Sequence, residues 1–199
     1  MNEELVWVVQ AQQGSDEAFT HLVEAYQKHV YNLCFRILGE PETAEDAAQE
    51  TFLRAYQHIN RYDRKRPFAT WLLSIAAHYC IDCLRRRKFS TTSIDQDEDE
   101  NGLELPDMDV PNPEAELIHS QQKEQMQGLL KKLDSMDRAA IILRYWNDCS
   151  ELEIAQTLNL TVSAVKSRLH RARRELAGLW QAETPRSKPE RRAHESPAF

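Results

Sequence analysis

SELEIAQTLNLTVSAVKSRLHRARR, residues 150–174, is the stretch that decides the fold of this chain. Ser150 and Glu153 have the S-x-x-E spacing of a capping box, which predicts that a helix begins directly after Ser150. Residues 159–160 predict a tight turn, and Thr161 is a suitable N-cap for a second helix. Two capped helices separated by so short a turn predict a helix-turn-helix.

The second helix of this stretch has two opposed faces. From Thr161 to Arg174 there are five Lys or Arg residues and no acidic residue. A cationic, hydrogen-bonding face opposite an apolar face suits binding in the DNA major groove. The alternative is a basic amphipathic helix in a bundle, whose charges form only a solvated face. The apolar face consists of Val162, Val165, Leu169, Ala172 and Leu176, and in the first helix Leu152, Ala155 and Leu158 are expected to face inward.

The composition predicts an all-α protein of one or two small domains. The chain has 199 residues, 41% of them hydrophobic, with only five glycines and little β-branched alternation. No apolar run approaches the roughly 18 residues of a membrane-spanning helix, and the N-terminus lacks the basic region of a signal peptide. We therefore expect a cytoplasmic protein without membrane insertion.

The net charge of −7 is unevenly distributed along the chain. Residues 89–117 contain ten acidic residues and no Lys or Arg. The blocks on either side are close to neutral or positive, so both remain able to bind a polyanion.

The four cysteines, Cys34, Cys80, Cys83 and Cys149, are more typical of a reducing cytosol than of a disulfide framework. Cys80-x-x-Cys83 is compatible with zinc or redox chemistry, but a structural zinc site needs four ligands and no second pair is present. We expect buried thiols that pack as small apolar groups, with no metal and no cofactor.

The organisation along the chain is predicted from caps, prolines and charge. Ser15 is expected to cap a helix that ends at Leu38 before Gly39, with Pro41 in the first turn of the next element. Further helices are expected from about 43 to 59 and from the residue after Pro67 to about 87. The core candidates of the first of these helices are Ala18, Leu22, Ala25, Val30, Leu33 and Ile37.

These elements predict two helical domains on an acidic tether. The expected segments are an N-terminal domain at 1–88, a disordered linker at 89–113, a C-terminal domain at 114–182 and a flexible tail at 183–199. The linker has too few apolar groups to offset the chain entropy lost on folding.

Four motifs in this order resemble the extracytoplasmic-function (group IV) sigma factors of bacterial RNA polymerase. They are DAAQETFLRAY (46–56), PFATWLLSIA (67–76), IDCLRRRK (81–88) and the helix-turn-helix that ends in RARREL. The resemblance covers residues 18–179 and implies an all-α promoter-specificity subunit that binds core RNA polymerase and promoter DNA, without a catalytic site of its own. It also implies control by an anti-sigma factor.

The resemblance implies a core-polymerase contact on the first of these motifs. The spacing of Asp46, Gln49, Glu50 and Leu53 at i, i+3, i+4 and i+7 forms a single helical face that suits a basic helical partner. The implied contact residues are Asp46, Gln49, Glu50 and Phe52, although a solvated face and core packing by Phe52 are the alternatives.

Residues 62–88 interleave basic and aromatic groups, a pattern that holds unpaired bases by stacking and phosphate contact. The resemblance implies that this region binds the minus-ten promoter element as a single strand. Core packing is the alternative for Trp71 and Ile75. The implied minus-ten residues are Tyr62, Arg64, Lys65, Arg66, Trp71, Ser74, Ile75, His78, Arg85, Arg86, Arg87 and Lys88.

The second helix of the helix-turn-helix is implied to bind the duplex minus-thirty-five element. Lys166 can donate to guanine O6 or N7, and the arginines are better placed for phosphates. The implied residues are Ser163, Lys166, Ser167, Arg168, His170, Arg171 and Arg174.

The acidic linker is either a solubilising tether or a mimic of nascent RNA. The second hypothesis follows from the resemblance, which places residues 95–109 in the cationic active-site cleft of the polymerase. An enzyme is disfavoured because the chain has no phosphate-binding glycine loop, nucleophile elbow or zincin motif. The better rival is a stand-alone DNA-binding regulator that uses the helix-turn-helix alone.

Overall fold

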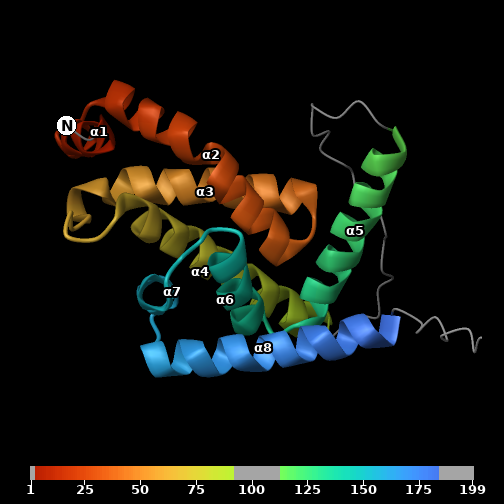
Figure 1. The fold of residues 1–199 in the computed structure, drawn as a ribbon. Helices are drawn as coiled ribbons and strands as arrows, with labels where there is room; N and C mark the ends of the chain where they lie inside the picture. Colours follow the sequence, from red (N-terminus) through yellow and green to blue (C-terminus); the bar gives the residue numbers. More distant parts are fainter. Residues whose placement is uncertain (1–2, 92–112, 184–199) are drawn as a thin grey trace, which may run out of the picture.

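The computed structural model describes residues 3–91 and 113–183, and every regular element in these ranges is helical (Figure 1). The prediction of an all-α fold is confirmed. The RNA-mimic hypothesis for residues 95–109 and most of the predicted tail lie outside the described residues. The elements are α1 (Glu3–Gln12), α2 (Asp16–Leu38), α3 (Pro41–His58), the short 3₁₀ helix η1 (Ile59–Arg61), α4 (Phe68–Thr91), α5 (Pro113–Lys132), α6 (Ser135–Tyr145), α7 (Glu151–Leu158) and α8 (Val162–Glu183).

The caps of α2 are as predicted. Ser15 Oγ accepts a hydrogen bond from the Ala18 amide at 3.2 Å, and the helix ends at Gly39. Gly39 has a left-handed φ of 84°, and its amide donates to the Phe35 carbonyl at 2.7 Å. This conformation is accessible to glycine without steric cost, so α2 stops here and the chain reverses into α3.

Three helix boundaries differ from the predictions. α3 begins at Pro41 rather than near 43, because the fixed φ of proline suits the first position of a helix. α4 continues to Thr91 and α5 begins at Pro113, so helix covers both edges of the expected 89–113 linker.

α1 has no counterpart among the predicted helix ranges. Val8 and Ala11 are its buried residues, and the Tyr26 hydroxyl donates to Glu4 Oε2 at 2.5 Å. A helix of ten residues is marginal in isolation, so α1 depends on its packing against α2 for stability.

Two of the predicted core residues are exposed. Ala25 lies off the buried stripe of α2, where Tyr26 packs against the core instead. Leu152 is 59% exposed, and Ile154 takes the buried position in α7. In α2, Tyr26 buries more apolar area than Ala25 could. In α7, Leu152 and Ile154 are of equal size, and Leu152 lies off the face formed by the buried residues Ile154, Ala155 and Leu158.

The helix-turn-helix forms as predicted. Ser150 and Glu153 make the reciprocal capping box, and Asn159 ends α7 with a left-handed φ of 54°. Thr161 Oγ1 then accepts from the Ala164 amide at 3.2 Å, which caps α8. α8 runs beneath α6 and α7 in Figure 1.

The two predicted domains pack against each other at the end of α2. The last carbonyls of a helix have no partner within it, and side chains from the C-terminal half bind them here. Gln127 Nε2 donates to the carbonyls of Phe35 and Arg36, both at 3.1 Å. The buried guanidinium of Arg138 donates to the Ile37 carbonyl at 2.7 Å.

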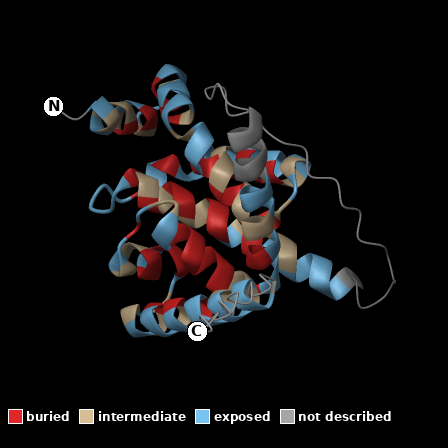
Figure 2. Ribbon diagram, turned by 45° about the vertical axis from the view of Figure 1, so that its right-hand side comes forward, coloured by how far each residue is buried: buried red, intermediate tan, exposed pale blue. Residues whose placement is uncertain are grey.

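We call this contact between the end of α2 and the residues Gln127 and Arg138 the seam. It joins the two halves into a continuous core, which Figure 2 shows as buried segments at the centre of the molecule. Arg36 adds a contact over the ring of Trp146, 4.8 Å from the guanidinium carbon to the ring centroid. α7 also packs against α4. The sequence predicts two helical domains on a flexible acidic tether, and no pattern in it indicates this contact between them.

Candidate nucleic-acid interface

α8 carries its buried and exposed residues on opposite faces. Val165, Leu169 and Ala172 are buried in the stripe that the periodicity predicts. Ser163, Lys166, Ser167 and His170 are exposed on the other side. Lys166 Nζ lies 3.6 Å from Glu151 Oε2 on α7, so its ammonium sits where the two helices meet. This face carries hydrogen-bond donors and acceptors at helical spacing, which a helix needs in order to recognise base edges in the major groove.

Two arginines of α8 are bound to a buried carboxylate on α6. Asp137, whose side chain is 2% exposed, accepts from Arg168 Nη1 at 2.6 Å. It also accepts from Arg171 Nε at 2.6 Å and Nη2 at 2.7 Å. Burial disfavours the charged form of Asp137, but the two guanidinium groups outweigh it and hold its pKa below the usual range. Arg168 and Arg171 therefore brace α8 against α6 as well as contributing positive charge.

A second candidate surface follows α4. Trp71, Ser74, His78 and Arg85 are spaced by 3, 4 and 7 residues, which places them along one side of the helix. Trp71 and Ser74 are half-buried, whereas His78 and Arg85 are exposed. The Ser74 hydroxyl donates to the Trp71 carbonyl at 2.6 Å, and His78 Nδ1 lies 2.7 Å from the Ser74 carbonyl.

The loop at residues 62–66 leads into this helix. Its three cations, Arg64, Lys65 and Arg66, are exposed. Tyr62, in contrast, is buried: its ring centroid lies 5.6 Å from that of Phe68 and 5.0 Å from that of Trp71. Burial raises the pKa of the Tyr62 phenol. In this conformation the ring anchors the loop to the core.

The basic run at the end of α4 has partners within the chain. Arg87 makes two bonds of 2.9 Å to the carboxylate of Glu40, and this guanidinium lowers the pKa of Glu40. Arg86 Nη2 donates to Cys83 Sγ at 3.3 Å, and Arg85 lies 3.7 Å from Asp82. Lys88 is exposed, as are these three arginines.

The exposed side of α3 forms a third surface. Asp46 and Gln49 are exposed, and Glu50 pairs with Arg54 at 2.6 Å. Phe52 is half-buried against the core, while Leu53 is 52% exposed and Tyr56 49% exposed. A stripe of polar and apolar side chains therefore runs along the exposed side of α3, with spacings of 3, 4 and 3 residues: Asp46, Gln49, Leu53 and Tyr56. The predicted face ends at Leu53, and the structure adds Tyr56 to it.

The cysteines do not assemble a metal site in the described ranges. No group of three or more His, Cys, Asp or Glu side chains there could hold a metal ion. Cys80 is buried and hydrogen-bonds with Cys34 on α2, and this contact and burial both raise the pKa of its thiol. A raised pKa disfavours the reactive thiolate. The thiol of Cys80 therefore lies against Cys34, a residue distant from it in sequence.

None of the helices in the described parts of the chain combines the length and apolar character that a membrane crossing requires.

Comparisons with known proteins match both halves of the chain. The family model of Sigma-70 region 2 matches residues 22–90, and that of Sigma-70 region 4 matches residues 123–176. The ECF RNA polymerase sigma factor SigW of Bacillus subtilis is 35% identical over 172 residues, which is 85% of this chain and 92% of SigW. The sigma factor CnrH of Cupriavidus metallidurans is 30% identical and covers 90% of this chain and 95% of its own.

Solved structures agree with the fold. CnrH in complex with the cytosolic domain of CnrY superposes with a TM-score of 0.67 and 27% identity, over 92% of this chain and 100% of that chain. The sigma factor RpoE of Bartonella quintana, solved with the anti-sigma factor NepR, has a TM-score of 0.66 at 18% identity over 83% of this chain and 98% of its own.

The helix-turn-helix, the order of the two regions and the extent of the match define the class: a sigma-70-type promoter-specificity protein. The chain belongs to the ECF family of bacterial RNA polymerase sigma factors. It binds core RNA polymerase and directs transcription initiation at promoters.

Proposed function

We propose that this sigma factor contacts its promoter through α8 and through α4 with the 62–66 loop, and contacts core polymerase through the exposed side of α3. On α8 the proposed minus-thirty-five residues are Ser163, Lys166, Ser167, Arg168, His170, Arg171 and Arg174. The observation that carries this assignment is the separation of faces on α8. Its apolar stripe is buried, and exposed hydrogen-bonding groups line the opposite side.

The ion pairs of α8 suggest which of its residues contact bases and which contact phosphates. Ser163, Lys166, Ser167 and His170 have side chains in solvent, so we assign base-edge contacts to them. Arg168 and Arg171 are held by Asp137, which suits a contact with phosphate at a fixed position. Arg174 is exposed one turn beyond Arg171, and we assign it to the phosphates that follow.

The minus-ten element is proposed to bind as a single strand along α4. The exposed cations of the 62–66 loop would hold phosphates at the N-terminal end of α4. The basic residues 85–88 would hold further phosphates of the same strand near its C-terminal end. His78 and the exposed part of Trp71 lie between them for base contact, with Ser74 beside them. The proposed residues are Tyr62, Arg64, Lys65, Arg66, Trp71, Ser74, His78, Arg85, Arg86, Arg87 and Lys88, with Tyr62 acting by holding the loop.

Core polymerase is proposed to cover the stripe on α3. Asp46, Gln49 and Glu50 supply charge and hydrogen bonds, and the exposed Leu53 supplies apolar area in place of the half-buried Phe52. Such a mixture of a central apolar group and acidic neighbours suits a basic helical partner.

Three further assignments accompany this function. We propose a specificity subunit without catalytic activity of its own, acting in the cytoplasm where polymerase and DNA are found. We propose an N-terminal domain ending near α4 and a C-terminal domain beginning with α5. CnrH was solved with the cytosolic domain of CnrY, and RpoE of Bartonella quintana with the anti-sigma factor NepR, so we also propose control by an anti-sigma protein.

Run-off transcription with bacterial core polymerase and a promoter library tests the function. Promoter-specific transcripts that require this protein are the expected result, with loss of minus-thirty-five dependence in a Lys166→Ala variant. Tight duplex binding by the protein alone, without a complex with core polymerase, would instead identify a stand-alone regulator.

A further inference from the structure

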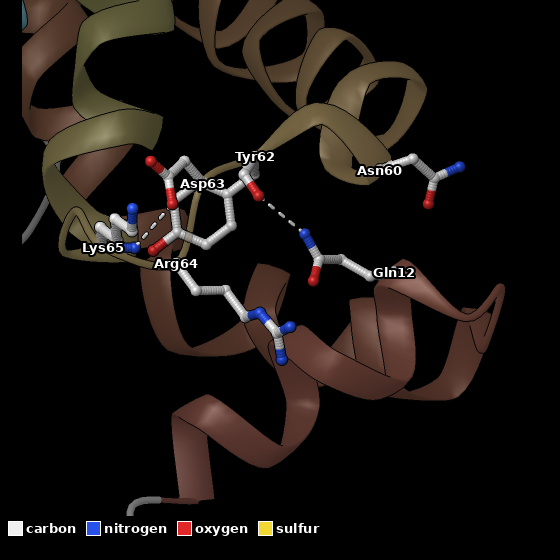
Figure 3. Close-up of a pocket in the computed structure, with 6 residues that line it drawn as sticks. All are labelled: Gln12, Asn60, Tyr62, Asp63, Arg64 and Lys65. Carbon is white, nitrogen blue, oxygen red and sulfur yellow. Dashed lines mark hydrogen bonds between the residues drawn. The ribbon is translucent and has the colours of Figure 1, made fainter.

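The C-terminal end of α1 lies against the 62–66 loop, although α1 precedes the residues that match Sigma-70 region 2. Val8 and Ala11 are buried, and Trp7 lies beside the ring of His21 with 5.3 Å between the ring centroids. These contacts fix α1 on α2. Gln12 follows the buried Ala11 and is the last residue of α1, and its side chain points toward the loop (Figure 3).

Gln12 makes two long-range hydrogen bonds from one side-chain atom. Its Nε2 donates to the Ile59 carbonyl at 3.0 Å and to the Tyr62 carbonyl at 2.9 Å. Ile59 is the first residue of η1 and Tyr62 is its C-terminal cap. Both carbonyls therefore lie where the helical hydrogen bonding that runs from α3 into η1 ends. Both hydrogens of the Gln12 amide are thereby used to define how the chain enters the loop.

The remainder of the loop is closed by its own hydrogen bonds. The Lys65 amide donates to Asp63 Oδ1 at 3.0 Å, and the Arg66 amide donates to the Asp63 carbonyl at 3.1 Å. The Tyr62 hydroxyl donates to the Arg66 carbonyl. With Gln12 at its entry and Tyr62 in the core, the loop has a defined shape before any ligand binds.

This shape leaves a hollow of about 670 Å³ between α1 and the loop. The residues that line it are two cations, one carboxylate, two amides and an aromatic ring: Arg64, Lys65, Asp63, Gln12, Asn60 and Tyr62 (Figure 3). Positive charge beside hydrogen-bonding groups matches the phosphate and base of a single unpaired nucleotide.

We propose that Gln12 is a positioning residue for minus-ten recognition: it holds the 62–66 loop in the shape that accepts an unpaired nucleotide. The inference rests on the proposed role of the loop in minus-ten binding. It adds a residue from α1, outside the region 2 match, to the determinants of promoter opening.

The test compares holoenzymes that carry Gln12→Glu, Gln12→Lys or Gln10→Ala. Glutamate has the shape of glutamine but offers only acceptors to the two carbonyls, whereas the lysine ammonium can donate to both. Gln10 is an exposed glutamine on the same helix and is the matched control. The measurements are closed-complex affinity, the rate of promoter opening, and the preference among the four bases at each minus-ten position.

For Gln12→Glu we expect opening to slow by about tenfold and base preference to flatten, with closed-complex affinity unchanged, since two hydrogen bonds are lost at the loop alone. Gln12→Lys should restore base preference, and Gln10→Ala should match the wild type. A wild-type preference in Gln12→Glu, while Arg64→Ala still slows opening, would overturn the inference and leave the proposed function standing. No minus-ten preference in the wild type would overturn the proposed function itself.

Discussion

Replacing Asp137 with asparagine should loosen α8 from α6. The carboxylate accepts three hydrogen bonds of 2.6–2.7 Å from Arg168 and Arg171. Hydrogen bonds to charged groups each contribute about 1.5–3 kcal/mol. Arg171 is 58% exposed and Arg168 27% exposed, so water compensates both guanidinium groups when the carboxylate is removed. Asparagine also keeps one acceptor. We therefore expect a loss of about 2 kcal/mol rather than the sum of the three bonds.

Urea denaturation of the full chain measures this loss as a lower midpoint at an unchanged slope. Asp134→Asn is the matched control. Asp134 is exposed, contacts Arg168 only at 3.7 Å, and caps α6 through the Met136 amide, a role that asparagine performs equally well. Its effect should stay below about 0.5 kcal/mol. Equal losses of unfolding free energy in the two variants would show that the bonds from Asp137 to Arg168 and Arg171 do not hold α8 against α6.

The same pair predicts a dependence on pH. The pKa of Asp137 is lower in the folded protein than in the unfolded chain. Its contribution is therefore complete above the ordinary aspartate pKa of about 3.9 and is lost as the pH falls through the folded value. Wild-type stability should decline more steeply than that of Asp137→Asn below about pH 4. Parallel curves for the two proteins would show that the ion pair contributes nothing.

Four further predictions concern the surfaces, the seam and a cap. Lys166→Ala should cost about 1–3 kcal/mol in minus-thirty-five binding and relax base preference there, measured by holoenzyme binding to a duplex series. Leu53→Asp should weaken core-polymerase binding by about 2 kcal/mol while leaving the unfolding midpoint in place, because this side chain is 52% exposed. Arg138→Met should destabilise the packed arrangement by about 2–3 kcal/mol, because it leaves the Ile37 carbonyl without its donor; a fluorophore pair across the seam should report greater separation, and an unchanged distance would contradict this. Ser150→Ala should cost about 1 kcal/mol by removing the capping box of α7, whereas Ser150→Asn should be close to neutral.

The elements that local sequence governs were predictable. Ser15, Gly39, Ser150 and Thr161 act on the backbone within four residues of themselves, so their caps follow from spacing alone. The apolar stripe of α8 and the helix-turn-helix follow for the same reason, since helical periodicity is a local property. The family resemblance carried by the four motifs is confirmed by the matches to both sigma regions.

Contacts between distant residues were decided only by the tertiary structure. The spacing of Asp137 and Arg171 in the sequence does not distinguish an ion pair between helices from two solvated charges. The sequence also gives no sign that Arg138 is buried, because its burial depends on the contact with the end of α2. Gln12 lies 50 residues from the Tyr62 carbonyl that it binds. Hydrogen bonds of this kind depend on how the helices are packed, and packing is set by the sum of many side-chain contacts rather than by any one motif. Local sequence therefore determined most of the helices and the two faces of α8, while the packed fold stabilised α1 and decided which polar groups of the helices meet.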